Sequence, residues 1–128
     1  MAQQPKINVR HQPSVAILDV HGDIDGQAED ILESAYTRAE RQDPAAIVLN
    51  VTQVNYINSK GIALIVVLLR RATESGRRLL VCGLNDHYQE IFQITRLSDY
   101  IIVCTDEETA LTLTRTQSHE TAVPLPSR

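Results

Sequence analysis

Two short polar segments carry the side chains that could take part in chemistry. The first contains Asp23 and Asp25, separated by one residue, and the second contains Asn58, Ser59 and Lys60 directly before an apolar run. A serine at the start of a helix can accept a phosphoryl group, because free backbone N–H groups and the helix dipole favour negative charge there. The two carboxylates could form an acid–base or metal pair, although the other ligands of a calcium loop are absent. The same residue types are also common in turns and helix caps, so the pattern alone leaves both interpretations open.

Motifs of the common enzyme and cofactor classes are missing from the sequence. The chain has no nucleophile elbow, no Walker loop and no dinucleotide-binding glycine pattern. A phospho-receiver domain would need a lysine late in the chain, whereas the only lysines are Lys6 and Lys60. Cys82 and Cys104 each close an apolar run, and the histidines show no metal-ligand spacing. We therefore expect a protein that is not an enzyme and that holds neither a cofactor nor a metal.

The composition is that of an ordinary globular chain and argues against several kinds of partner. The 128 residues are 43% hydrophobic and 22% charged, with a formal net charge of −4. One domain of this acidity lacks the basic surface of a dedicated nucleic-acid-binding protein. The longest apolar run, residues 62–69, is too short to cross a bilayer, and no apolar secretion signal follows the N-terminus. We expect a cytoplasmic protein that binds neither nucleic acid nor membrane.

The elements that position the polar segments follow from the hydrophobic pattern. Alternation over residues 6–11 and 15–20 predicts a β-hairpin, and helical spacing over residues 27–42 predicts a first helix. The pattern predicts later strands at residues 46–51, 79–82 and 101–104, and later helices at residues 62–75, after Asn85 or Asp86, and from Asp106 onward. This order predicts an α/β domain in which the hairpin joins a mostly parallel sheet of four to five strands, with about four helices packed against it. The domain is expected to span residues 1–115, followed by a loosely ordered tail at residues 116–128.

The helix expected at residues 62–75 is apolar on more than one face. On a helical wheel Lys60 marks the solvent side, and Ala63 and Val67 fall on that side with Leu64 at its flank. An exposed apolar strip beside a serine that could carry charge is typical of a protein interface. The alternative is that a neighbouring segment of the chain covers this helix.

Together these segments resemble bacterial STAS domains, specifically the anti-sigma-factor antagonists. The strand at residues 46–51 and the segment at residues 54–64 are similar to the family's apolar strand, Asp-Ser-Ser/Thr-Gly motif and apolar helix, with Asn58-Ser59-Lys60-Gly61 at the motif. Further similar segments lie at residues 22–25, 76–84, 91–97 and 106–111. The resemblance covers roughly residues 6–115.

The resemblance implies a switch between partners. In such families the unmodified antagonist binds an anti-sigma factor that is also a serine kinase of the histidine-kinase-like ATPase type, which releases a sigma factor. Phosphorylation of the motif serine breaks the complex, and a PP2C-type phosphatase restores it. By position that serine is Ser59, and Asp25 matches the loop acid that lies near the phosphorylation site and contacts the kinase. The expected partner-binding residues are Asp23, Asp25, Asn58, Lys60, Ala63, Leu64 and Val67.

Two positions depart from the family pattern. Asn58 stands where the family usually has Asp, and Lys60 stands where it usually has Ser or Thr. Asn58 keeps the capping geometry without the charge, and Lys60 removes a second candidate phosphorylation site. Two other functions stay open. The chain could be a scaffold of a larger signalling assembly whose Ser59 is never modified, or an enzyme or nucleotide-binding domain that uses Asp23 and Asp25.

Overall fold

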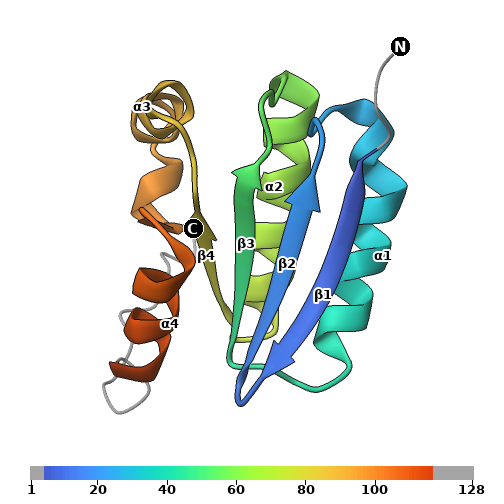
Figure 1. The fold of residues 1–128 in the computed structure, drawn as a ribbon, viewed down its shortest axis with the longest axis vertical. Coiled ribbons are helices and arrows are strands. Elements are labelled where there is room, and N and C mark those ends of the chain that lie inside the picture. Colours follow the sequence, from blue (N-terminus) through green and yellow to red (C-terminus); the bar gives the residue numbers. More distant parts are fainter. Residues whose placement is uncertain (1–4, 117–128) are drawn as a thin grey trace.

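A five-stranded sheet with helices on both faces forms the protein. Figure 1 shows the ribbon of this computed structural model, which describes residues 5–116. The strands follow one another across the sheet in sequence order; β1 and β2 are antiparallel and the later pairs are parallel. The strands are β1 (Lys6–Gln12), β2 (Val15–His21), β3 (Ala46–Gln53), β4 (Arg78–Cys82) and β5 (Ile102–Cys104). The α-helices are α1 (Glu29–Glu40), α2 (Ser59–Glu74), α3 (Asp86–Ile94) and α4 (Glu107–Thr116), with short 3₁₀ helices η1 (Gly26–Ala28) and η2 (Leu97–Asp99).

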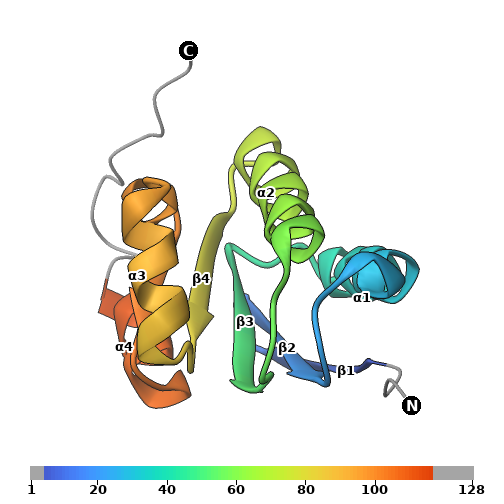
Figure 2. The same ribbon diagram turned by 90° about the horizontal axis from the view of Figure 1, so that it is seen from above.

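Each face of the sheet is covered by a separate apolar cluster. Side chains alternate between the two faces along a strand, so Ile47 and Leu49 of β3 enter one cluster and Val48 enters the other. The larger cluster packs against α1, α2 and α3, whereas the smaller one includes Ala110 of α4. Figure 2 shows α1 and α2 together on one side of the sheet. Burial on both faces explains why the central parallel strands are apolar almost throughout.

The structure confirms the expected α/β domain with its hairpin and mostly parallel sheet. Some element boundaries differ from the expectation. The first helix begins at Glu29, because residues 26–28 form the separate 3₁₀ helix η1. The second helix includes Ser59 and Lys60 ahead of the apolar run. The last helix extends to Thr116, and the rest of the expected tail, residues 117–128, lies outside the described residues.

The two cysteines lie side by side in the smaller cluster. Cys82 of β4 and Cys104 of β5 are register partners, and both are buried and free. Burial raises the pKa of the Cys82 thiol to about 12, so this thiol stays protonated and unreactive at neutral pH. Within residues 5–116 there is no group of three or more His, Cys, Asp or Glu side chains that could hold a metal ion. No helix in the same range is long and apolar enough to span a membrane.

Candidate functional site

Backbone hydrogen bonds join the two polar loops that follow β2 and β3. The Ile24 N–H donates to the Tyr56 carbonyl at 2.9 Å, and the Asn58 N–H donates to the Ile24 carbonyl at 3.2 Å. Ile24 and Ile57 form an isolated parallel β-bridge at the same place. The loops lie at the carboxyl ends of neighbouring parallel strands, which is where α/β sheets commonly place functional groups. The two polar segments of the sequence therefore belong to one continuous surface.

Gly61 allows the start of α2 to touch the first of these loops. A Cβ atom at this position would lie 2.0 Å from the Ile24 carbonyl oxygen, so only glycine fits. On the other side, the Ile57 N–H donates to the buried Tyr88 hydroxyl at 2.8 Å, which ties the second loop to α3. A close backbone approach on one side and a hydrogen bond to the Tyr88 hydroxyl on the other therefore hold the segment that carries Ser59.

Asn58, rather than Ser59, caps helix α2. Asn58 has extended backbone geometry, and its Oδ1 accepts the Gly61 N–H at 2.8 Å. Ser59 is the first residue of the helix and is exposed. Among the described residues its hydroxyl has no hydrogen-bond partner. The interpretation of Ser59 as merely a cap is wrong, because its exposed hydroxyl is not used in capping.

The charged residues around Ser59 differ in how firmly they are held. Asp25 is half-buried, and its Oδ1 accepts the Gln27 N–H at 2.9 Å and so caps η1. Asp23 is half-buried on the same loop. Lys60 is exposed, and its Cγ lies 3.5 Å from where a Cβ on Gly26 would be. The side chain of Lys60 therefore passes along the loop that carries both acids.

Three residues on the outer face of α2 form an exposed apolar surface, here called the α2 strip: Ala63, Val66 and Val67. Val66 is 42% exposed and Val67 is 43% exposed, and Ala63 is also exposed. Tyr56, in the loop before the helix, is 51% exposed. Because α1 and α3 leave this face uncovered, the alternative that a neighbouring segment of residues 5–116 covers it is wrong.

The structure removes one residue from the expected exposed apolar surface and adds two. Leu64 is only 5% exposed and belongs to the larger core cluster, so it is not available at the surface. The reason is that Leu64 lies next to Ile65 and Leu68 on the helix face that packs on the sheet. Val66 and Tyr56 were not expected from the sequence. Val66 lies at the edge of the apolar face of the helical wheel, where the pattern does not distinguish core from surface. Tyr56 lies in the loop before the helix, so the helical wheel does not include it.

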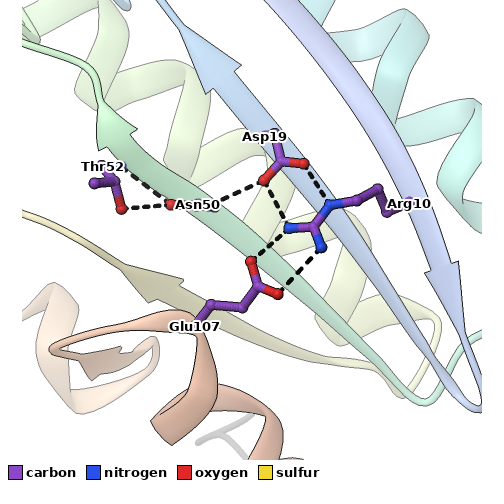
Figure 3. A network of polar contacts seen from close by, with 5 residues as sticks. All are labelled: Arg10, Asp19, Asn50, Thr52 and Glu107. Carbon is purple, nitrogen blue, oxygen red and sulfur yellow. Dashed lines mark hydrogen bonds and ion pairs between the residues drawn. The ribbon is translucent and has the colours of Figure 1, made fainter.

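A second polar cluster, on the α4 side of the sheet, is shown in Figure 3. Arg10 of β1 donates to Asp19 of β2 at 2.9 Å and to Glu107 of α4 at 3.1 Å. Asp19 also accepts the Asn50 side-chain N–H at 2.9 Å, and Asn50 accepts the Thr52 hydroxyl at 2.6 Å. The hydrogen bonds from Arg10 hold the pKa of Asp19 below its ordinary value. This network fastens the start of α4 to the hairpin.

Anti-sigma factor antagonists are among the known proteins that this chain is similar to. An anti-sigma-B factor antagonist of Staphylococcus aureus is 29% identical over 84 residues, which is 66% of this chain and 78% of that protein. An anti-sigma factor antagonist from Mycobacterium paratuberculosis has a crystal structure that matches with a TM-score of 0.77 at 19% identity, over 90% of this chain and 99% of that one. The Bacillus cell fate determinant SpoIIAA in its phosphorylated form matches with a TM-score of 0.67 at 17% identity, over 86% of this chain and all of that one (100%).

The family assignment rests on the length of the match as well as on the fold. The model of the STAS domain matches residues 6–114, which include every strand of the sheet and both loops of the candidate site. The parallel sheet, the Ile24–Ile57 bridge and the exposed start of α2 all lie inside this range. The chain belongs to the STAS domain family.

Proposed function

We propose that this protein is an anti-sigma-factor antagonist that is switched by phosphorylation of Ser59. In the unmodified state it binds an anti-sigma factor that is also a serine kinase of the histidine-kinase-like ATPase type. The observation that carries the proposal is the free, exposed Ser59 hydroxyl directly beside the exposed α2 strip. The curated Staphylococcus aureus relative, an anti-sigma-B factor antagonist, supports the same function.

The kinase step changes one bond at Ser59. The Ser59 oxygen attacks the γ-phosphorus of ATP, the bond to ADP breaks, and the hydroxyl proton passes to a base of the kinase. The product carries about −1.5 to −2 additional charge at neutral pH. A partner docked on the α2 strip would then have to desolvate and accommodate that charge, which favours release. A PP2C-type phosphatase removes the phosphoryl group by hydrolysis and restores the binding form.

In this function the chain itself is a binding module and not an enzyme, and it acts in the cytoplasm. Asp23, Asp25, Asn58 and Lys60 form the polar rim of the docking surface, and the α2 strip with Tyr56 forms its apolar centre. A polar rim around an apolar centre is the usual arrangement of a transient protein interface. Leu64 supports the strip from the core and does not itself touch the partner.

The first test is phosphosite mapping by mass spectrometry after incubation in lysate of the protein's own source, with ATP and phosphatase inhibitors. We expect phosphate on Ser59, and we expect none at this peptide in Ser59→Ala. The Ser59→Ala chain then serves as bait for the kinase, with Val67→Glu as the matched bait that keeps the serine but disrupts the α2 strip. A fully covered, unmodified Ser59 peptide beside a working positive control would contradict the proposal. A stable, ATP-independent assembly of high mass would then favour a scaffold.

A further inference from the structure

Lys60 stands out among the charges near Ser59 because no acid holds it. Within residues 5–116 its ammonium forms no ion pair, although Asp23 and Asp25 lie on the loop that its side chain crosses. The first turn of α2 contains no acidic residue either. The sequence places this lysine directly after the serine. A cation on a long, flexible stem, without an ion pair of its own, therefore begins one residue after Ser59.

The start of α2 favours a phosphoryl group on Ser59, whereas Asp23 and Asp25 of the adjoining loop oppose its negative charge. Asp25 is directed by the hydrogen bond that its Oδ1 accepts from the Gln27 N–H. Asn58 is neutral, so it offers no positive charge, and its Oδ1 accepts the Gly61 N–H. Lys60, directly after Ser59 on α2, carries the positive charge that could pair with such a group. An ammonium group on a long, flexible stem is suited to pair with a phosphate as a point charge.

We propose that Lys60 is the counter-charge of phosphorylated Ser59, pairing its ammonium with the phosphoryl dianion at the start of α2. This inference rests on the proposed modification of Ser59 and makes Lys60 a positioning residue rather than a catalytic one. The pair offsets the repulsion from Asp23 and Asp25 and holds the phosphoryl group in one arrangement on the docking surface. The neutral Asn58 also favours this pair, because an acid at position 58 would compete with the phosphoryl group for the Lys60 ammonium.

The test uses the full chain with phosphoserine installed at position 59 during synthesis, so that no kinase is needed. The second ionisation of the phosphate, ordinarily near pH 6, is followed by ³¹P NMR as a function of pH. An adjacent cation favours the dianion and lowers this midpoint. We expect Lys60→Gln to raise the midpoint by about half a pH unit at low salt. We also expect Lys60→Arg to keep the low midpoint, and about 1 M salt to remove most of the difference.

Lys6→Gln is the matched control, because Lys6 is the other lysine of the chain and lies on β1. It should leave the midpoint unchanged. Equal midpoints for the Lys60→Gln and unsubstituted phosphorylated chains would overturn the inference. If Lys60 had only a structural role, arginine would not restore the low midpoint of the phosphate ionisation, and salt would not remove the difference between the two chains. Since the phosphoserine is built in, this result does not depend on whether a kinase modifies Ser59, which the phosphosite mapping decides separately.

Discussion

The surface around Ser59 and the network around Arg10 lie on opposite faces of the sheet and use their polar groups in opposite ways. Around Arg10, one guanidinium is shared by two carboxylates, and one of these also accepts an amide N–H. Around Ser59, the backbone of Asn58 and its Oδ1 are hydrogen-bonded, but the Ser59 hydroxyl and the Lys60 ammonium have no partner within residues 5–116.

The comparison separates polar groups that hold the fold from those that are available to partners. Exposed groups such as Ser59 and Lys60 are solvated by water, so leaving them unpaired costs little stability. The backbone beneath them is rigid, because the loops are joined through Ile24 and tied to Tyr88. A rigid base with free side chains suits a docking surface, whereas paired side chains suit a structural contact.

The strongest way to break this arrangement is to push the two loops apart with Gly61→Ala. The new Cβ would lie 2.0 Å from the Ile24 carbonyl oxygen, and that oxygen is backbone and cannot rotate away. We expect the free energy of unfolding, measured by urea denaturation, to fall by about 3 kcal/mol. Gly26→Ala is the matched control, since its Cβ would make an ordinary 3.5 Å contact with the Lys60 stem. A Gly61→Ala chain as stable as the control would show that the close approach of the loops is not needed.

A second substitution, Ser59→Asp, alters only the charge of the free surface. We expect it to weaken binding to the kinase by about a hundredfold in titration calorimetry, or ~2.7 kcal/mol, because a fixed charge is placed beside the α2 strip. Stability should stay within about 0.5 kcal/mol of the original chain, since an acid at a helix start is favourable. Ser98→Asp, at an exposed serine of η2, is the control for the added charge. Undiminished affinity of the Ser59→Asp chain would mean that charge at this position does not drive release.

The sequence was sufficient for the order of elements because that order depends on local patterns. The near-continuous apolar run of β3 and the helical spacing of α2 are each visible within a few residues. Leu64 was misplaced because a helical wheel gives the angle of a side chain but not the direction of the sheet. The Arg10 network was missed because Glu107 lies 97 residues from its partner, and no local pattern reports such a pairing. Joining of the two loops through Ile24 was missed for the same reason.

Removing the Arg10 guanidinium tests the contribution of the polar network on the α4 side of the sheet. Arg10→Met leaves Asp19 and Glu107 as neighbouring carboxylates without their shared partner. We expect a loss of about 1 kcal/mol in the free energy of unfolding, a modest value because 42% of the Arg10 side chain is exposed and solvent screens the pair. Binding to the kinase should be unchanged, since α2 lies on the other face. Weakened binding in this variant would show that the two regions are coupled.

The smallest expected effect is the pH dependence of the Arg10 network, and it follows from the direction of the Asp19 shift. Hydrogen bonding to Arg10 lowers the pKa of Asp19 in the folded chain. The stability that this carboxylate contributes is therefore fully present above the ordinary Asp value of about 3.9, and it is lost as the pH falls through the lower folded value. Denaturation at a series of pH values below about 4 should give a steeper decline for the original chain than for Asp19→Asn, which has no carboxylate to protonate. Parallel declines in the two chains would mean that Arg10 does not stabilise the Asp19 carboxylate and that the network contributes less than its geometry indicates.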